Sequence, residues 1–192
     1  MTRLCFSFLL FISAISISAK NHTESTPITG VPTATVADAK EWAKKKGATD
    51  AFIALADLYW KKATELGINP VVAYCQAAKE TGYGRFGGII DATFNNPCGI
   101  KSFRRDGDHK DDHMRFETWE DGVEAHLDHL ALYIGLEGYP KDETKDPRHH
   151  GYLKGIAKTV KEMGRRWAMS PGYSTELARM IKTLENMSVK RK

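Results

Sequence analysis

The sequence has little cysteine, no strong excess of charge and only one long apolar run. Three of its 192 residues are cysteine, and 28 Lys and Arg stand against 24 Asp and Glu, a formal net charge of +4. This mild basicity suits an anionic polymer but excludes the dense phosphate contacts of a nucleic-acid-binding protein. With 42% hydrophobic and 27% charged residues, the composition indicates a globular domain rather than a disordered chain or a multi-span membrane protein.

The long apolar run lies at the N-terminus, over residues 4–17. Arg3 precedes it, and the small residues Ser18 and Ala19 follow, which is the pattern of a secretory signal peptide over residues 1–19. The run is shorter than a bilayer core requires, so an uncleaved anchor is the weaker alternative. We therefore expect a secreted, extracellular protein that does not contact a membrane once the signal is removed.

The remaining chain reads as a linker followed by one domain. Residues 20–34 are rich in Thr, Ser, Pro and Gly, and they include a glycosylation triplet at Asn21 that matters only in a glycosylating host. Residues 35–188 form the predicted domain. Helical spacing of apolar residues and flanking start and stop residues predict helices over about 36–46, 50–66, 71–81, 119–134, 152–163 and 174–187.

One segment between these helices has a different pattern. Residues 100–103 and 114–116 are apolar stretches on either side of a polar tip at 106–113, which predicts a small β-hairpin. The expected fold class is therefore α+β and predominantly α-helical. Two start signals are specific: Asn69 precedes Pro70, and Thr118 with Asp121 forms the pattern of a capping box.

Histidines offer no convincing metal site. His126 and His129 lie three residues apart on a predicted helix, and His149 and His150 are adjacent, but no carboxylate or thiolate stands at a zinc-binding spacing from them. Histidines on helix surfaces are the commoner case. We expect no metal and no cofactor.

Four short stretches carry a resemblance to a known family, and they occur in that family's order. The chain resembles the bacterial endo-β-N-acetylglucosaminidases, the autolysin and flagellar-type peptidoglycan hydrolases of the lysozyme-like superfamily. The resemblance implies a lysozyme-like fold in which the hairpin lobe flanks a cleft. It also implies a monomeric hydrolase of β-1,4 N-acetylglucosaminyl bonds in peptidoglycan glycan strands. The stretches are residues 77–84 (AAKETGYG), 95–101 (NNPCGIK), 116–122 (FETWEDG), and Trp167-Ala168 with Pro171-Gly172-Tyr173.

Glu80, in the first of these stretches, is the predicted catalytic acid. Glycosidic cleavage requires a protonated carboxylic acid beside the leaving oxygen. The negative end of a helix dipole disfavours ionisation, and Glu80 stands at the predicted end of a helix. Gln76 lies one turn earlier on the same face, where it is expected to hold the acid or contact substrate.

The second catalytic carboxylate is less determined. The resemblance implies an acidic residue on the hairpin, where the sequence offers Asp106, Asp108, Asp111 and Asp112. We favour Asp111, followed by Asp112. Solvated turn charges are the alternative for any one of them, and the 2-acetamido group of the substrate could then replace a second carboxylate.

Further site residues follow from the resemblance. Tyr173 matches a tyrosine that the family places near the cleft, with a core-edge position as the alternative. Tyr83 is expected to stack on a sugar ring, unless it belongs to the core. Asn95 and Asn96 are expected to bind acetamido groups, or else to shape a turn.

Cysteine usage predicts one disulfide. Cys5 leaves with the signal, so Cys75 and Cys98 remain, an even number in a chain bound for an oxidising compartment. Their pairing would fasten the helix of Glu80 to the loop before the hairpin. Two buried free thiols are the alternative.

Two other functions stay open. A muramidase or a lytic transglycosylase also uses a glutamate at a helix end, but cleaves the alternate bond of the same polymer. A glycan-binding protein without catalysis is the second alternative, against which the presence of Glu80 argues.

Overall fold

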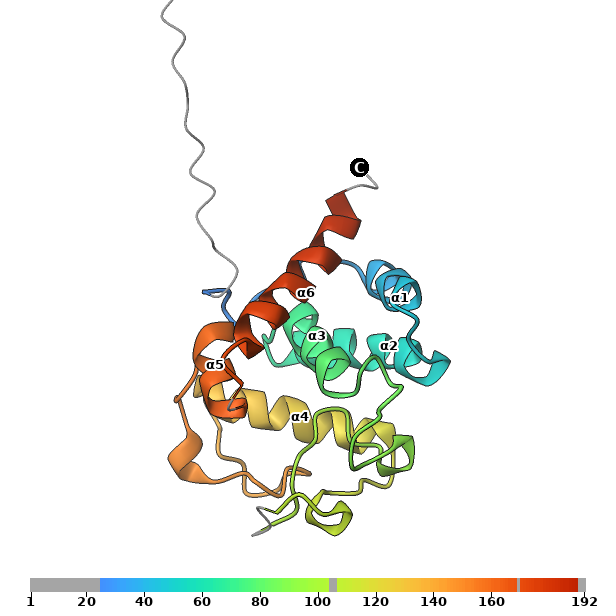
Figure 1. Cartoon of the computed structure of the whole chain (residues 1–192). Coiled ribbons are helices and arrows are strands. Elements are labelled where there is room, and N and C mark those ends of the chain that lie inside the picture. Colours follow the sequence, from blue (N-terminus) through green and yellow to red (C-terminus); the bar gives the residue numbers. More distant parts are fainter. Residues whose placement is uncertain (1–24, 104–106, 169, 190–192) are drawn as a thin grey trace, which may run out of the picture.

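The computed structural model describes residues 25–103, 107–168 and 170–189, so the predicted signal over residues 1–19 lies outside it. These described residues fold into a body of helices (Figure 1), without a β-strand and without a helix of the length and apolarity that a membrane span requires. The α-helices are α1 (Val36–Lys45), α2 (Asp50–Glu65), α3 (Pro70–Glu80), α4 (Trp119–Ile134), α5 (Val160–Trp167) and α6 (Tyr173–Val189). Short 3-10 helices are η1 (Ala92–Phe94), η2 (Lys110–Asp112) and η3 (Gly151–Leu153).

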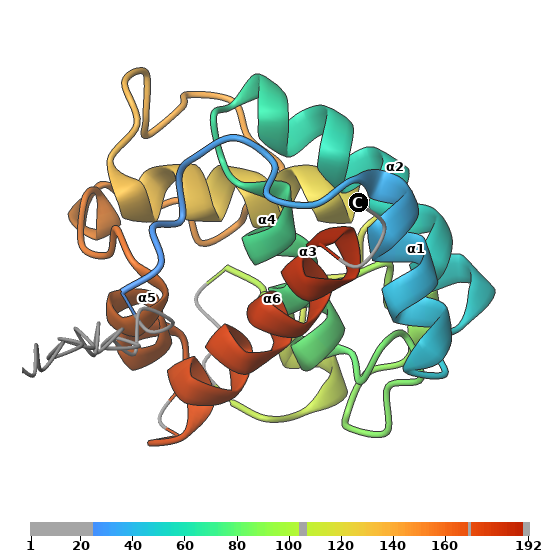
Figure 2. The ribbon, with the colours of Figure 1, turned by 90° about the horizontal axis from the view of Figure 1, so that it is seen from above.

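Helix α3 lies at the centre of the molecule. Residues 70–78 of this helix are all buried, α2 and α6 pack against it, and α1 packs against both of those helices. Figure 2 shows α6 crossing over α3 with α1 and α2 beside them. As predicted, α3 begins after Asn69, whose Oδ1 accepts a hydrogen bond from the backbone N–H of Val71 at 3.0 Å, with Pro70 in the first position. The core therefore fixes α3 and brings its last residue, Glu80, to the edge of the molecule.

Helix α4 also begins where its signal predicts. The Thr118 side chain accepts from the Asp121 N–H, and the Asp121 carboxylate accepts from the Thr118 N–H, both at 3.1 Å. The next residue, Gly122, contacts the loop that follows α3. A Cβ atom at Gly122 would lie 1.9 Å from the carbonyl oxygen of Asn95, so only glycine allows this approach.

The helix predicted over residues 152–163 is wrong in its position. Tyr152 lies in η3, and α5 runs from Val160 to Trp167. Gly155 adopts a φ of 74°, which a right-handed helix cannot include, and the chain turns there. Thr159 and Glu162 then form a capping box that starts α5 eight residues later than expected.

The predicted β-hairpin is also wrong. Between residues 99 and 118, the described residues form one isolated antiparallel bridge, Lys101 with His113, and the return segment contains η2 instead of a strand. The Asn96 side chain explains why. Its amide accepts from the Ile100 N–H at 3.0 Å and donates to the carbonyls of Ile100 and Met114 at 2.9 Å, so it occupies backbone groups that a ladder would use. A pair this short does not extend further alone.

Residues 25–34, the described part of the predicted linker, pack against the helices. Ile28 is fully buried, its N–H donates to the Lys158 carbonyl at 3.0 Å, and its carbonyl accepts from the Asn69 N–H at 2.9 Å. The Val160 N–H donates to the carbonyl of Thr26 at 2.9 Å. This segment therefore joins the starts of α3 and α5.

Candidate active site

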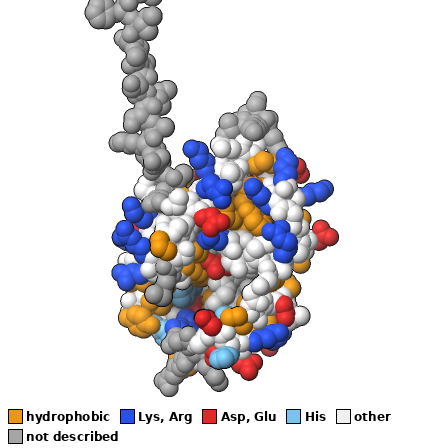
Figure 3. Space-filling model, viewed as in Figure 1, with side chains coloured by type: hydrophobic (Ala, Val, Ile, Leu, Met, Phe, Trp, Pro, Cys, Tyr) orange, Lys and Arg blue, Asp and Glu red, His pale blue; other side chains and the backbone are white. Residues whose placement is uncertain are grey.

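A groove of about 400 Å³ opens beside the end of α3. Figure 3 shows the same face as Figure 1, hollowed near its centre, with acidic side chains beside the hollow. The groove lies between the last residues of α3 and α5 and the two loops that follow α3. Its lining comprises Glu80, Phe86, Gly88, Ile89, Ile90, Asn96, Cys98, Gly99, Lys101, Asp108, His113, Trp167 and Ala168.

Glu80 combines access to the groove with an environment that favours its protonated form. Burial raises the pKa of this carboxyl above its usual range. Hydrogen bonds from Tyr173 and Trp167 and the charge of Lys79 oppose that rise without cancelling it. The position at the C-terminal end of α3 acts in the same direction as burial, because the helix dipole is negative there. Glu80 therefore suits the role of proton donor.

Tyr173, the first residue of α6, contacts the acid directly. Its hydroxyl donates a hydrogen bond to Glu80 Oε1, and the side chain is buried. Burial, together with the nearby Glu80 charge, raises the pKa of this phenol, so the hydroxyl keeps its proton. The Lys79 ammonium lies 5.0 Å from the centre of the Tyr173 ring and forms an ion pair with Glu176. Residues 93 positions apart thus meet at the acid.

A chain of buried side chains continues behind Tyr173. Gln76 donates to the Tyr173 hydroxyl at 3.2 Å, His126 Nε2 lies 3.1 Å from Gln76 Oε1, and Tyr59 Oη lies 2.8 Å from His126 Nδ1. Gln76 is fully buried and does not line the groove, and it reaches the acid through Tyr173 instead of bonding it directly. His126 was expected at the surface, yet it is fully buried, and that burial lowers its pKa to about 3.

Trp167, the last residue of α5, is supported by a second group of polar and aromatic side chains. The His129 ring meets it edge to face at 5.3 Å, and the Tyr133 ring lies 6.1 Å away. His129 Nδ1 lies 2.7 Å from Asp146 Oδ2. Burial alone would raise the pKa of Asp146, but the hydrogen bond and charge of His129 hold it below its usual range.

Within the part of the chain that the structure describes, no cluster of three or more His, Cys, Asp or Glu could hold a metal ion.

The acidic residue across the groove is Asp108. Its side chain is 85% exposed and forms an ion pair with Lys101 at 2.6 Å, and the hydrogen bond from Lys101 lowers its pKa. The favoured candidates Asp111 and Asp112 do not line the groove. Asp112 is buried because it caps η2, accepting from the His109 N–H at 3.0 Å. Asp106 lies outside the described residues.

The other predicted substrate contacts have structural roles. The Tyr83 ring packs 5.3 Å from that of Trp42 and does not line the groove. Asn95 has a φ of 51° and donates to the carbonyls of Phe116 and Glu117 at 3.1 and 3.0 Å, so it shapes a turn. Asn96 lines the groove, but its buried amide is engaged with the backbone of residues 98–114.

The predicted disulfide is not formed. Cys75 and Cys98 are both free and buried. The two thiols belong to separate clusters of side chains. Cys75 lies in the main helical core, whereas Cys98 packs with Ile100, Phe116 and Ala125 under the groove. Burial raises the pKa of both thiols, which makes them unreactive core residues.

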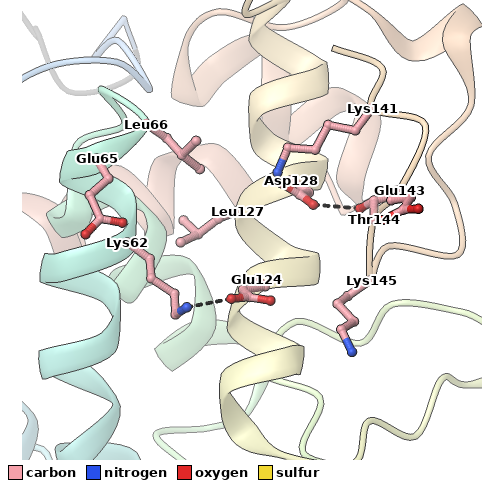
Figure 4. A pocket seen from close by; sticks show the side chains of 10 residues that line it. All are labelled: Lys62, Glu65, Leu66, Glu124, Leu127, Asp128, Lys141, Glu143, Thr144 and Lys145. Carbon is pink, nitrogen blue, oxygen red and sulfur yellow. Dashed lines mark hydrogen bonds and ion pairs between the residues drawn. The ribbon is translucent and has the colours of Figure 1, made fainter. Parts of the chain in front are cut away.

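A second hollow, of about 570 Å³, is larger but chemically different. Figure 4 shows it between α2, α4 and the loop around residues 141–145. Its lysines are engaged with carboxylates: Lys62 lies 2.5 Å from Glu124, and Lys141 lies 2.7 Å from Asp128. Glu80 does not line this hollow. The smaller groove, which brings an acid of raised pKa to an open surface, is therefore the candidate active site.

Comparison with known proteins points to one family. Residues 56–186 match the glucosaminidase family model, described as mannosyl-glycoprotein endo-beta-N-acetylglucosaminidase. A protein of Borreliella burgdorferi named "Uncharacterized protein" is 27% identical over 117 residues, which cover 60% of this chain and 54% of that protein. The chain thus matches about half the length of this curated relative. No solved structure matches the chain.

Proposed function

The chain belongs to the glucosaminidase family, the mannosyl-glycoprotein endo-beta-N-acetylglucosaminidases, and from this membership we propose that it is a secreted peptidoglycan hydrolase that cleaves β-1,4 N-acetylglucosaminyl bonds. One observation carries the proposal: Glu80, a carboxyl whose pKa is raised by burial, ends α3 at the edge of an open groove. A glycosidase needs such a group beside the scissile bond.

In the proposed reaction, Glu80 donates its proton to the glycosidic oxygen as the bond to that oxygen breaks. The hydroxyl of Tyr173 and the ring of Trp167 hold the carboxyl and stabilise the carboxylate that remains, because both donate hydrogen bonds to it. Both donors come from helix ends: Tyr173 begins α6, and Trp167 ends α5.

We assign Asp108 as the second carboxylate. The environments of the two acids separate their pKa values: burial raises that of Glu80, and Lys101 lowers that of Asp108. Such a pair provides an acid and an ionised base in one site. Asp108 would take a proton from the water that attacks the sugar, which gives inversion if the carboxyls lie roughly 6.5–9.5 Å apart in the complex. Attack by the 2-acetamido group of the substrate is the competing route.

The proposal also includes location. Residues 1–19 would direct secretion, and the mature protein would act as a monomer on the wall. N-terminal sequencing of protein recovered from the medium tests the cleavage site, and light scattering tests the monomer.

Analysis of the sugar ends of digested peptidoglycan tests the reaction. The proposal expects new reducing N-acetylglucosamine ends. Reducing or anhydro N-acetylmuramic acid would instead identify a muramidase or a lytic transglycosylase. Wall binding without any new ends, equal in the wild type and in Glu80→Gln, would identify a binding protein.

A further inference from the structure

The hydrogen bonds behind Glu80 form one continuous chain through the core. Its five side chains come from four helices: Tyr59 from α2, His126 from α4, Gln76 and Glu80 from α3, and Tyr173 from α6. Tyr59, His126 and Gln76 are fully buried. These three polar side chains contact neither solvent nor the groove, yet they end at the acid.

With Gln76 Oε1 facing His126, the chemistry of the members gives one order of donors and acceptors along this chain. A Gln76 Oε1 atom can only accept, so His126 must carry its hydrogen on Nε2. Because burial lowers the pKa of His126 to about 3, the ring is neutral and Nδ1 has no hydrogen. Tyr59 therefore donates to Nδ1, at 2.8 Å. At the other end, the Gln76 amide N–H donates to the Tyr173 hydroxyl, whose own hydrogen goes to Glu80 Oε1.

The reversed order is less favourable. In it, Glu80 would donate to Tyr173, Tyr173 to Gln76, Gln76 to His126 Nε2, and His126 Nδ1 to Tyr59. The hydroxyl hydrogen of Tyr59 would then be buried without an acceptor, because His126 is the one hydrogen-bond partner that the described residues provide for it. A buried donor without an acceptor costs more than a hydroxyl oxygen with an unused lone pair.

We propose that Gln76, oriented by its hydrogen bond with His126, is a positioning residue that fixes which oxygen of Glu80 carries the catalytic proton. Since Oε1 accepts the hydrogen of Tyr173, the acidic hydrogen belongs on Oε2. In the reversed order, that hydrogen would lie on Oε1 in a hydrogen bond to Tyr173, so it would not face the glycosidic oxygen. The functional consequence rests on the proposed function, whereas the hydrogen-bond order does not.

Nitrogen-15 NMR of the histidine rings tests the order without any substrate. The full-length protein is recorded from pH 5 to 8, and His126 is assigned by the signals that His126→Asn loses. We expect a neutral ring over this range, with hydrogen on Nε2 and none on Nδ1. Hydrogen on Nδ1, or a charged ring at pH 6, would overturn the proposal.

Two conservative variants test whether the order survives the loss of one hydroxyl. Tyr59→Phe removes the terminal donor and leaves His126 Nδ1 with an unused lone pair, which costs less than a buried N–H without an acceptor, so the order should persist. Tyr74→Phe is the control: it also deletes a buried hydroxyl, which donates to the Phe52 carbonyl at 3.2 Å, outside the chain. We expect kcat and KM within about twofold of the wild type in both variants, and hydrogen on His126 Nε2 in both. Hydrogen on Nδ1 in Tyr59→Phe would contradict the order.

Gln76→Glu probes the centre of the chain. The new carboxylate would accept from both His126 and Tyr173, so Glu80 would lose the hydrogen bond that lowers its pKa. Lys79, Trp167 and Cys98 still face Glu80, and the added negative charge raises the pKa further. We expect lower kcat and an alkaline limb of the pH–rate profile at higher pH. An unmoved limb in a folded variant would contradict the chain. If Gln76→Glu does not fold, the tautomer of His126 in the wild type and in Tyr59→Phe decides.

Failure of the proposed function gives a different result. If the wild-type protein cleaves no glycan, the proposed reaction is refuted, but the His126 tautomer can still be measured. The pKa of Glu80, followed by carbon-13 NMR of the side-chain carboxyl, should still rise in Gln76→Glu and not in Tyr59→Phe or Tyr74→Phe. An active enzyme with the opposite His126 tautomer would refute the proposed hydrogen-bond order and leave the proposed function intact.

Discussion

The helical wall of the groove, formed by Glu80 and Trp167, holds its acid through a succession of side-chain hydrogen bonds that begins at the buried Tyr173 and reaches the core. The loop wall, residues 95–103 and 107–113, presents Asp108 at the surface with Lys101 as its bonded partner. In the helical wall, burial raises the pKa of Glu80. In the loop wall, the ion pair with Lys101 lowers the pKa of Asp108. The two walls therefore move the pKa values of their carboxyls in opposite directions, which is the pattern of a paired acid and base.

The largest expected effect comes from removing the acid of the helical wall. Glu80→Gln should lower turnover of peptidoglycan about 10²–10⁴-fold, the range that general acid catalysis supplies. The amide can still accept the hydrogen bond from Tyr173, so the thermal unfolding midpoint should change little. Turnover within about tenfold of the wild type would contradict the assignment, whatever the state of the loop wall.

The second prediction concerns the stability of the loop wall and not its chemistry. Asn96→Ala removes the amide that bonds the backbone of Ile100, Met114 and Cys98. Because it leaves buried backbone groups without partners, the free energy of unfolding should fall by about 2–4 kcal/mol. Urea titration followed by fluorescence measures it. A loss below about 0.5 kcal/mol would show that the wall does not depend on this side chain.

A smaller effect should distinguish the acids of the loop wall. Asp108→Asn should lower kcat about 10- to 100-fold, because the ionised carboxylate no longer takes a proton from water. Asp111→Asn serves as the control and should retain wild-type kcat, because Asp111 is exposed and does not line the groove. Equal activity in the two variants would instead favour attack by the acetamido group of the substrate.

Tyr173→Phe should give the smallest change in rate and a shift in pH dependence. The acid acts while protonated, so activity is lost as the pH rises through the pKa of Glu80. The hydroxyl lowers that pKa, so its removal raises the pKa and moves the alkaline limb to higher pH. In the plateau below that limb, kcat should fall about tenfold because the carboxyl is less well oriented. A limb at lower pH would contradict this account.

Much of the helical wall could be predicted from sequence. Asn69 before Pro70 marked the start of α3, and the motif around Glu80 marked its end. The contact between Glu80 and Tyr173 needed the family resemblance, because no local pattern relates residues 93 positions apart. His126 was missed, although it lies on the same face of α4 as the buried residues Val123 and Leu130. That spacing was the available signal for a buried histidine.

The loop wall was predicted poorly for a physical reason. Alternating apolar residues around a polar tip normally form a hairpin, but here the Asn96 side chain takes the hydrogen bonds that would continue a ladder. All four candidate aspartates were placed at the tip of that hairpin, so its pattern could not separate Asp108 from Asp111. The pairing of Cys75 with Cys98 rested on an even count and an oxidising compartment, neither of which carries information about distance.

Segment 25–34 has a consequence for the geometry of the acid. It bonds the first residues of α3 and α5, and these two helices end in Glu80 and Trp167, which are in contact with each other. Both helices are thus anchored at one end by a common strap and converge at the other on the same carboxyl. Because the starts of α3 and α5 are held together, the angle between the two helices sets the distance between Glu80 and Trp167. Residues 25–34, none of which lines the groove, therefore contribute to the alignment of the proton donor.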